Sequence, residues 1–118
     1  MSAAPIGPYT PVVQTGDFVF VSGQVGLADG AIVEGGLVAE TQQAMTNLAA
    51  QLATVGATLD DVAKTTCFLV DMGDYAAFNE VYVAALGDHR PARSCVAVAA
   101  LPAGAVVEVE AIARLSGS

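Results

Sequence analysis

A single arginine stands out among the residues whose type and position suit chemistry. Arg93 lies in the segment Pro91-Ala92-Arg93-Ser94-Cys95-Val96, at the entrance of a predicted strand, and the chain holds only four lysines and arginines in all. A guanidinium at such a position can bind a carboxylate through two parallel hydrogen bonds. The alternative is a structural ion pair with one of the twelve acidic residues, and the residue types alone favour that alternative.

Two glutamates interrupt the apolar strand predicted over 106–115. Strand alternation places Glu108 and Glu110 on one face, together with Ile112, and the valines and alanines between them on the other. A carboxylate in a buried strand is costly unless it is paired or takes part in chemistry, and desolvation raises its pKa toward the range of a general acid or base. That both glutamates face solvent near a sheet edge is equally consistent with the sequence, which does not separate Glu108 from Glu110.

The cysteines and the histidine give weaker signals. Cys67 and Cys95 both lie in predicted strands, which indicates free thiols rather than a disulfide scaffold. Cys95 shares a face with Arg93, about 6.5–7 Å along the strand. The only histidine, His89, lies in a loop with no carboxylate placed to orient it, so a Cys-His nucleophile pair is disfavoured and no zinc site is indicated. Cys95 is interpreted as a small apolar residue that lines a pocket.

Two further candidates lie near the N-terminus. Tyr9 follows a Gly-Pro turn that fixes the direction of its ring. Ser22-Gly23-Gln24 ends a predicted strand, where backbone N–H groups can hold an oxygen atom or a water molecule. The glycines of segment 26–36 match no phosphate-binding pattern, so no nucleotide cofactor is indicated.

The elements that must position these residues form one mixed sheet. Strands are predicted over 12–14, 18–22, 64–70, 93–100 and 106–115, and helices over 37–55 and 75–86. The order ββαβαββ predicts an α+β fold with both helices packed on one face of the sheet. The segment 26–36 is interpreted as a mobile loop with a short strand at 32–33.

Helical spacing also predicts which side chains the two helices bury. In the first helix the apolar stripe runs from Leu37 and Val38 through the later apolar residues to Val55. In the second helix, Asp74 is the expected N-cap. The predicted inward stripe of this helix consists of Tyr75, Phe78, Tyr82 and Leu86.

Composition limits the classes of partner. The chain has 118 residues, which predicts a single domain over 1–118, and only 14% are charged against 54% apolar. Because average domains are about 25% charged, we expect the sheet face without helices to be hidden between subunits. The net charge of −8 argues against nucleic acid and acidic membranes as partners. No basic and apolar leader and no bilayer-length apolar run occurs, so a cytoplasmic location is expected.

Six segments in this order resemble the RidA/YjgF family over nearly the whole chain. They are Ile6-Gly7-Pro8-Tyr9, Val21-Ser22-Gly23-Gln24, Lys64-Thr65-Thr66, Phe78-Asn79-x-x-Tyr82, Pro91-Ala92-Arg93-Ser94-Cys95-Val96 and Val107-Glu108-Val109-Glu110-Ala111-Ile112-Ala113. The resemblance implies a chorismate-mutase-like α+β fold and a homotrimer with three clefts at the subunit interfaces. Segments 25–27 and 87–90 depart from the family pattern.

The resemblance also implies an activity and residue roles. The expected reaction is hydrolysis of 2-aminoacrylate or 2-aminocrotonate, through 2-iminopropanoate or 2-iminobutanoate, to a 2-oxo acid and ammonia without metal or organic cofactor. Arg93 would bind the substrate carboxylate and Glu108 would hold and activate the attacking water. Cys95 and Ser22 would line the cleft, and Tyr9 would close it.

The same residues are compatible with other functions. A regulatory trimer that binds a small 2-oxo acid or amino acid without catalysis would keep Arg93 but would not need Glu108. A deaminase of a different enamine from catabolism would keep both residues. A chaperone that depends on modified basic side chains is disfavoured by the four lysines and arginines, and a ribonuclease is disfavoured by the charge of −8.

Overall fold

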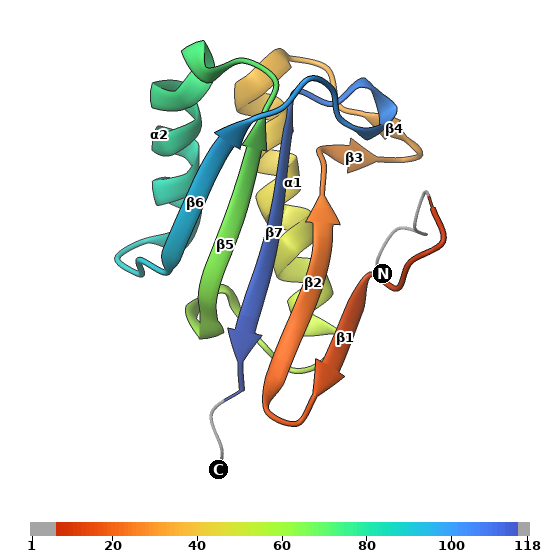
Figure 1. Cartoon of the computed structure of the whole chain (residues 1–118), viewed down its shortest axis with the longest axis vertical. Coiled ribbons are helices and arrows are strands. Elements are labelled where there is room, and N and C mark those ends of the chain that lie inside the picture. The colour runs from red at the N-terminus through yellow and green to blue at the C-terminus, as the bar shows by residue number, and fades with distance from the viewer. Residues whose placement is uncertain (1–6, 116–118) are drawn as a thin grey trace.

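A five-stranded mixed sheet carries two helices on one face (Figure 1). The computed structural model describes residues 7–115. Its sheet order is β1-β2-β7-β5-β6, and only β5 and β6 run parallel. The strands are β1 (Val12–Thr15), β2 (Phe18–Gln24), β5 (Val62–Leu69), β6 (Ala92–Ala97) and β7 (Val107–Arg114), and the helices are α1 (Gly36–Ala53) and α2 (Tyr75–Leu86). The predicted α+β class and the order ββαβαββ are confirmed.

The segment after β2 is not the loop that the sequence suggested. It contains a small hairpin of β3 (Leu27–Ala28) and β4 (Ala31–Ile32), joined by a two-residue Asp29-Gly30 turn. Both turn residues have positive φ, 53° and 81°, which suits an Asp-Gly turn between antiparallel strands. The Asn47 side chain of α1 donates to the carbonyl oxygens of Val25 and Leu27, at 3.0 and 2.9 Å, and holds the hairpin on the helix. The prediction of a mobile loop is therefore wrong, whereas the short strand expected at 32–33 is present one residue earlier, as β4.

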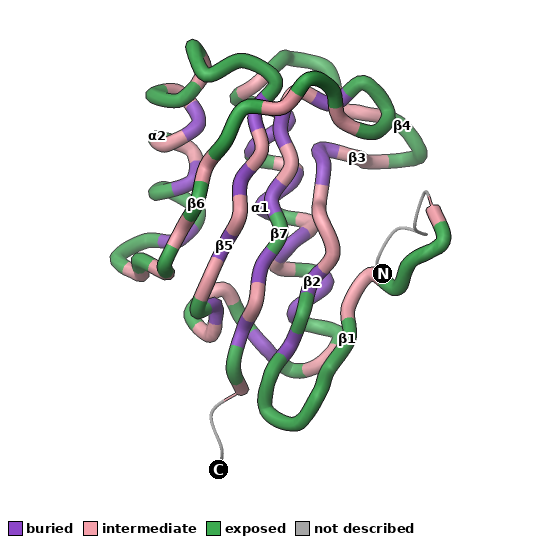
Figure 2. The backbone as a smooth tube through the Cα atoms, viewed as in Figure 1, coloured by how far each residue is buried: buried purple, intermediate pink, exposed green. Residues whose placement is uncertain are grey.

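Alternation along the strands separates a buried sheet face from an open one (Figure 2). In β7 the residues Val107, Val109, Ala111 and Ala113 are buried under the helices, whereas Glu108 and Ile112 are only half-buried on the opposite face. Short 3₁₀ turns at Leu59–Asp61, Met72–Asp74 and Pro102–Gly104 complete the connections. No helix within residues 7–115 is long and apolar enough to cross a membrane.

The helix stripes differ from the sequence prediction at two places. Phe78, Tyr82 and Leu86 of α2 are buried as expected, but Tyr75 is 39% exposed and Val38 of α1 is 45% exposed. Asp74 occupies the N-cap position without a capping side-chain hydrogen bond. Tyr75 and Val38 both lie in the first turn of their helices, and in α1 the neighbouring Leu37 packs against the core instead.

A glycine allows the chain after β2 to contact α1 directly. A Cβ added at Gly26 would lie 2.7 Å from both the Cα and the carbonyl oxygen of Glu40. Glu40 is itself buried, at 6% exposure, and its carboxylate accepts a 2.9 Å hydrogen bond from the Val106 N–H. One buried glutamate thus joins the start of β7 to α1, at the position where Gly26 packs.

We expect Gly26→Ala to lower the free energy of unfolding by about 1–3 kcal/mol, because the new methyl group meets backbone rather than a movable side chain. Urea denaturation at fixed protein concentration measures the change. An unchanged denaturation midpoint would mean that the segment shifts away from α1 at no cost.

The open face of the sheet carries large apolar side chains. Val13, Phe18, Phe20 and Val96 are each 45–47% exposed, and strand alternation places all four opposite to the helices. Within the described residues, no other element covers this face. Exposed apolar patches of this kind mark interaction surfaces.

Candidate active site

Arg93 lies on the helix side of the edge strand β6, beside α2. Its in-register neighbour on β5 is Thr65, which is fully buried under the helices. The Arg93 Nη1 atom donates to Asn79 Oδ1 and the Nη2 atom donates to the Tyr75 hydroxyl, both at 2.8 Å. The guanidinium is therefore held on both of its terminal nitrogens by one helix.

Aromatic rings surround the same guanidinium. The Arg93 Cζ atom lies 5.0 Å from the centroid of the Tyr82 ring, 5.4 Å from that of Tyr75 and 5.9 Å from that of Phe78. These distances are within the range of cation–π attraction. Among residues 7–115, the side chains that contact the Arg93 guanidinium are all neutral. The structural ion pair that the sequence suggested for Arg93 is therefore absent from this part of the chain. Because no side chain in this region neutralises the guanidinium, its positive charge can attract an external anion.

One face of α2 supplies all these partners. Tyr75, Phe78, Asn79 and Tyr82 follow one another at spacings of three, one and three residues, so they lie on one side of the helix. The Tyr82 hydroxyl forms a 2.7 Å hydrogen bond with Thr65 Oγ1, and burial raises its pKa, so it stays neutral. Tyr75 and Asn79 were not among the residues predicted for the site. Their helical spacing placed them on one face of α2, but only the position of β6 shows that this face contacts Arg93.

Glu108 is the candidate acid–base residue, and it lies on the open face of β7. Its side chain is half-buried, whereas Glu110 is exposed. Burial raises the pKa of Glu108, and the charge of Glu110 raises it further. This combination separates the two glutamates, which the sequence did not, and it favours Glu108.

Gly23 fixes the position of the Glu108 carboxylate. The pairing of β2 with β7 is irregular between Val21 and Gln24, and a Cβ added at Gly23 would lie 2.6 Å from Glu108 Cδ. The absence of a side chain at Gly23 is what leaves room for the carboxylate against β2. This glycine was expected to contribute a backbone N–H, and the structure shows a steric role for it.

We expect Gly23→Ala to lower kcat by about 10–100-fold, because the methyl group displaces the carboxylate from its position. The φ angle of Gly23 is not among the positive ones, so alanine is compatible with the backbone and the unfolding midpoint should change little. Steady-state kinetics beside urea denaturation checks both parts. Full activity in a folded variant would show that this position of Glu108 is not the reactive one.

Arg93 and Glu108 do not meet within one chain. Arg93 extends to the face that the helices cover, and Glu108 extends to the opposite, open face of the same sheet. A site made of both residues therefore requires a second copy of the chain. The structure brings Arg93 and Cys95 together on one face, and it brings Glu108 and the Ser22-Gly23 segment together on the other.

Cys95 lies beside Arg93 and next to the buried Cys67 on β5, with which it is in register. Burial raises the pKa of the Cys95 thiol, although the Arg93 charge offsets part of the effect, and burial raises that of Cys67 to about 12. Both cysteines are free thiols in the described structure. A protonated thiol is a poor nucleophile, so the geometry fits the pocket-lining role.

We expect Cys95→Ala to keep kcat/KM within about fivefold of the parent value, since removal of a true nucleophile costs several orders of magnitude. Initial-rate measurements under reducing conditions make the comparison. A loss of a thousandfold or more would assign a covalent role to Cys95.

Ser22 and Tyr9 are connected through the N-terminal segment. The Ser22 hydroxyl donates to the Thr10 carbonyl at 2.7 Å, and the Ser22 N–H donates to the Pro11 carbonyl at 2.9 Å. Tyr9 is 43% exposed, and its ring packs close to Gly7. Ser22 thus fastens the segment that carries Tyr9, and its hydroxyl proton is already used. Ile6 of the resemblance lies outside the described residues.

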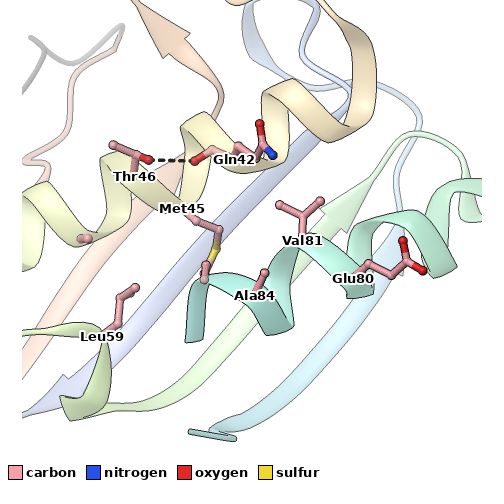
Figure 3. Close-up of a pocket in the computed structure, with 9 residues that line it drawn as sticks. Gln42, Met45, Thr46, Leu59, Glu80, Val81 and Ala84 are labelled. Atoms are coloured by element: carbon pink, nitrogen blue, oxygen red, sulfur yellow. Dashed lines mark hydrogen bonds between the residues drawn. The ribbon is translucent and has the colours of Figure 1, made fainter. Parts of the chain in front are cut away.

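Two other features do not form a catalytic centre. An open groove of about 600 Å³ between α1 and α2 is lined by Met45, Val81, Ala84 and their neighbours (Figure 3), and none of the sequence-predicted site residues lines it. His89 forms a 2.7 Å hydrogen bond through Nε2 with the Val62 carbonyl, which ties the loop after α2 to β5. Among residues 7–115, no cluster of three or more His, Cys, Asp and Glu side chains is arranged to hold a metal ion.

Known proteins resemble this chain over almost all of its length. The family model described as Endoribonuclease L-PSP matches residues 1–115. The Mus musculus protein named 2-iminobutanoate/2-iminopropanoate deaminase is 46% identical over 93% of this chain and 83% of its own. A RutC family protein of Pyrococcus horikoshii is 42% identical over 92% of this chain and 88% of its own. The crystal structure of E. coli TdcF with bound serine has a TM-score of 0.92 at 36% identity, covering 98% of this chain and 94% of that chain.

Proposed function

Because this chain belongs to the Endoribonuclease L-PSP (RidA/YjgF) family, we propose that it is an enamine/imine deaminase. Its substrates are 2-iminopropanoate and 2-iminobutanoate with their enamine tautomers, and its products are the 2-oxo acids and ammonia. Mouse, goat and cow relatives carry the name of this activity at 46%, 43% and 41% identity. The observation that carries the proposal is the half-buried Arg93 guanidinium, whose hydrogen-bond partners among residues 7–115 are all neutral.

The reaction needs little beyond orientation and one acid–base group. Arg93 binds the substrate carboxylate and holds C2 of the imine beside Glu108. Glu108 accepts a proton from water as the water oxygen bonds to C2, and the electron pair of the C=N bond moves to nitrogen. Glu108 passes that proton to the nitrogen, which gives an intermediate with a hydroxyl and an amino group on C2. Glu108 then moves the hydroxyl proton to the amino group, the C–N bond breaks, and ammonia leaves as the C=O bond of the 2-oxo acid forms. The burial that raises the pKa of Glu108 suits this exchange of protons.

We place this site between subunits of a homotrimer. The exposed apolar side chains of the open face, Val13, Phe18, Phe20 and Val96, support burial against another copy. The opposite orientation of Arg93 and Glu108 supports a cleft to which one protomer contributes the guanidinium and its partner the carboxylate. The free thiols Cys67 and Cys95 support a reducing, cytoplasmic setting.

Complementation between two inactive variants tests the shared site. Arg93→Ala and Glu108→Gln, co-expressed with different tags and purified through both, form mixed oligomers. If each site takes its two residues from different protomers, every mixed trimer has one intact interface, so about a third of the sites are restored. The control pairs Arg93→Ala with an Arg93→Ala/Glu108→Gln double variant, in which no site has the arginine. Mixed oligomers without activity would show that no such shared site exists.

The activity itself is tested by coupling to a threonine or serine dehydratase. Semicarbazide traps the imine, and the protein is expected to shorten the lifetime of the imine and speed keto-acid formation. Arg93→Ala serves as the inactive control. If neither the three-carbon nor the four-carbon imine decays faster, the proposed activity is wrong.

A carboxylate-binding protein without catalysis is the second candidate. The Arg93 site is complete on α2 and β6 without Glu108, and the E. coli relative TdcF has been solved with serine bound. Calorimetric binding of 2-oxobutanoate or serine, together with no acceleration of imine decay, would favour this function. The net charge of −8 disfavours an RNA substrate.

A further inference from the structure

The Tyr75 side chain lies outside the apolar core that packs α2 onto the sheet. Phe78 and Tyr82 are buried and hold the helix, whereas Tyr75 is 39% exposed in its first turn. The hydroxyl nevertheless accepts the 2.8 Å hydrogen bond from Arg93 Nη2, and the ring lies 5.4 Å from Cζ. Its role must therefore be sought at the guanidinium.

A free arginine side chain samples many rotamers, and a carboxylate bound through two parallel hydrogen bonds requires the guanidinium plane to have one orientation. Asn79 alone holds one terminal nitrogen and leaves the plane free to turn about that contact. The second contact, from Tyr75 to the other nitrogen, removes this rotation. Three of the five N–H donors have no hydrogen-bond partner in the described part of the chain and stay available for a ligand.

We infer that Tyr75 is a positioning residue, which fixes the plane of the Arg93 guanidinium for the ligand carboxylate. The inference rests on the proposed carboxylate-binding role of Arg93. A phenol suits the task because it is neutral: it accepts the hydrogen bond without neutralising the cation. An Asp or Glu at this position would form an ion pair and compete with the ligand.

Tyr75→Phe tests the inference, since it retains the ring and removes only the hydroxyl. We expect KM for 2-iminobutanoate to rise about tenfold with kcat within twofold, the size typical of one hydrogen bond to a charged group. The dissociation constant of 2-oxobutanoate should rise equally, and that of its neutral amide should not change. Glu80→Gln is the control, because Glu80 lies exposed on the same helix among the residues that line the groove toward α1.

An independent readout follows the arginine itself. The chain has three arginines, Arg90, Arg93 and Arg114, so ¹⁵N spectra of the guanidinium groups are simple to assign with Arg93→Lys. Slow rotation of the Arg93 Nη groups is expected in the parent protein and fast rotation in Tyr75→Phe. Unchanged rotation together with unchanged KM would overturn the inference.

The outcomes separate this inference from the proposed function. An inactive parent protein that still binds 2-oxobutanoate through Arg93 refutes the deaminase, and Tyr75→Phe then supports or overturns the inference through its dissociation constant. An active parent protein with an unaffected Tyr75→Phe overturns the inference alone. A parent protein that binds no carboxylate overturns both.

Discussion

Arg93→Ala is expected to lower kcat/KM for imine hydrolysis by about 10²–10³-fold, because it removes the only group of the proposed site that binds the substrate carboxylate. Arg93→Lys should recover only a small part of the activity, since an ammonium cannot form the two parallel hydrogen bonds and cannot reach Asn79 and Tyr75 together. The dehydratase-coupled assay measures both variants.

Stability must be followed beside activity for this residue. The Arg93 side chain packs against three aromatic rings, so alanine also leaves unfilled space, and some loss of unfolding free energy is expected. Arg90→Ala is the control, because Arg90 is exposed in the loop after α2 and donates to the backbone carbonyls of Gly87 and His89. Sedimentation analysis establishes whether the oligomer is retained. Normal activity in an Arg93→Ala protein that still forms the oligomer would show that Arg93 does not bind the substrate carboxylate.

Glu108→Gln is expected to lower kcat by about 10²–10³-fold, whereas Glu110→Gln should keep kcat within about threefold. Both substitutions remove one charge and keep the shape of the side chain. They differ because Glu108 is half-buried beside Gly23 and Glu110 is exposed. The reverse result would identify Glu110, two residues further along β7, as the reactive carboxylate.

The pH profile gives the same assignment a second test. The pKa of Glu108 is raised above its ordinary value of 4.5, first by burial and then by the charge of Glu110. The residue must be ionised to accept a proton from water, so kcat/KM should fall as pH decreases through that raised pKa. In Glu110→Gln one cause of the shift is gone, and this acid limb should move to lower pH. In Glu108→Gln the limb should disappear from the residual activity.

Some predictions were wrong because they used local sequence patterns, whereas contacts between distant parts of the chain decided the structure. Segment 26–36 was expected to be mobile because of its glycines, yet it forms a hairpin that Asn47 holds from α1. Tyr75 continued the apolar spacing of α2, yet its side chain contacts Arg93 instead of the core. The close approach of Gly26 to Glu40 could not be foreseen either, because the burial of Glu40 depends on how β7 enters the sheet.

The sequence by itself determined the main strands and helices, their α+β class and a short set of chemical candidates, Arg93 with the pair Glu108 and Glu110. Alternation along a strand and the spacing along a helix are local properties, so Val107 to Ala113 could be divided into two faces without any structure. Tertiary structure alone decided which of these faces the helices cover and on which of them each candidate lies. That outcome depends on non-local pairing: β6 joins β5 in parallel with Arg93 beside Thr65, and β7 joins β5 antiparallel with Glu108 beside Phe68. A shift of one residue in either register would exchange the faces, and no local signal fixes those registers.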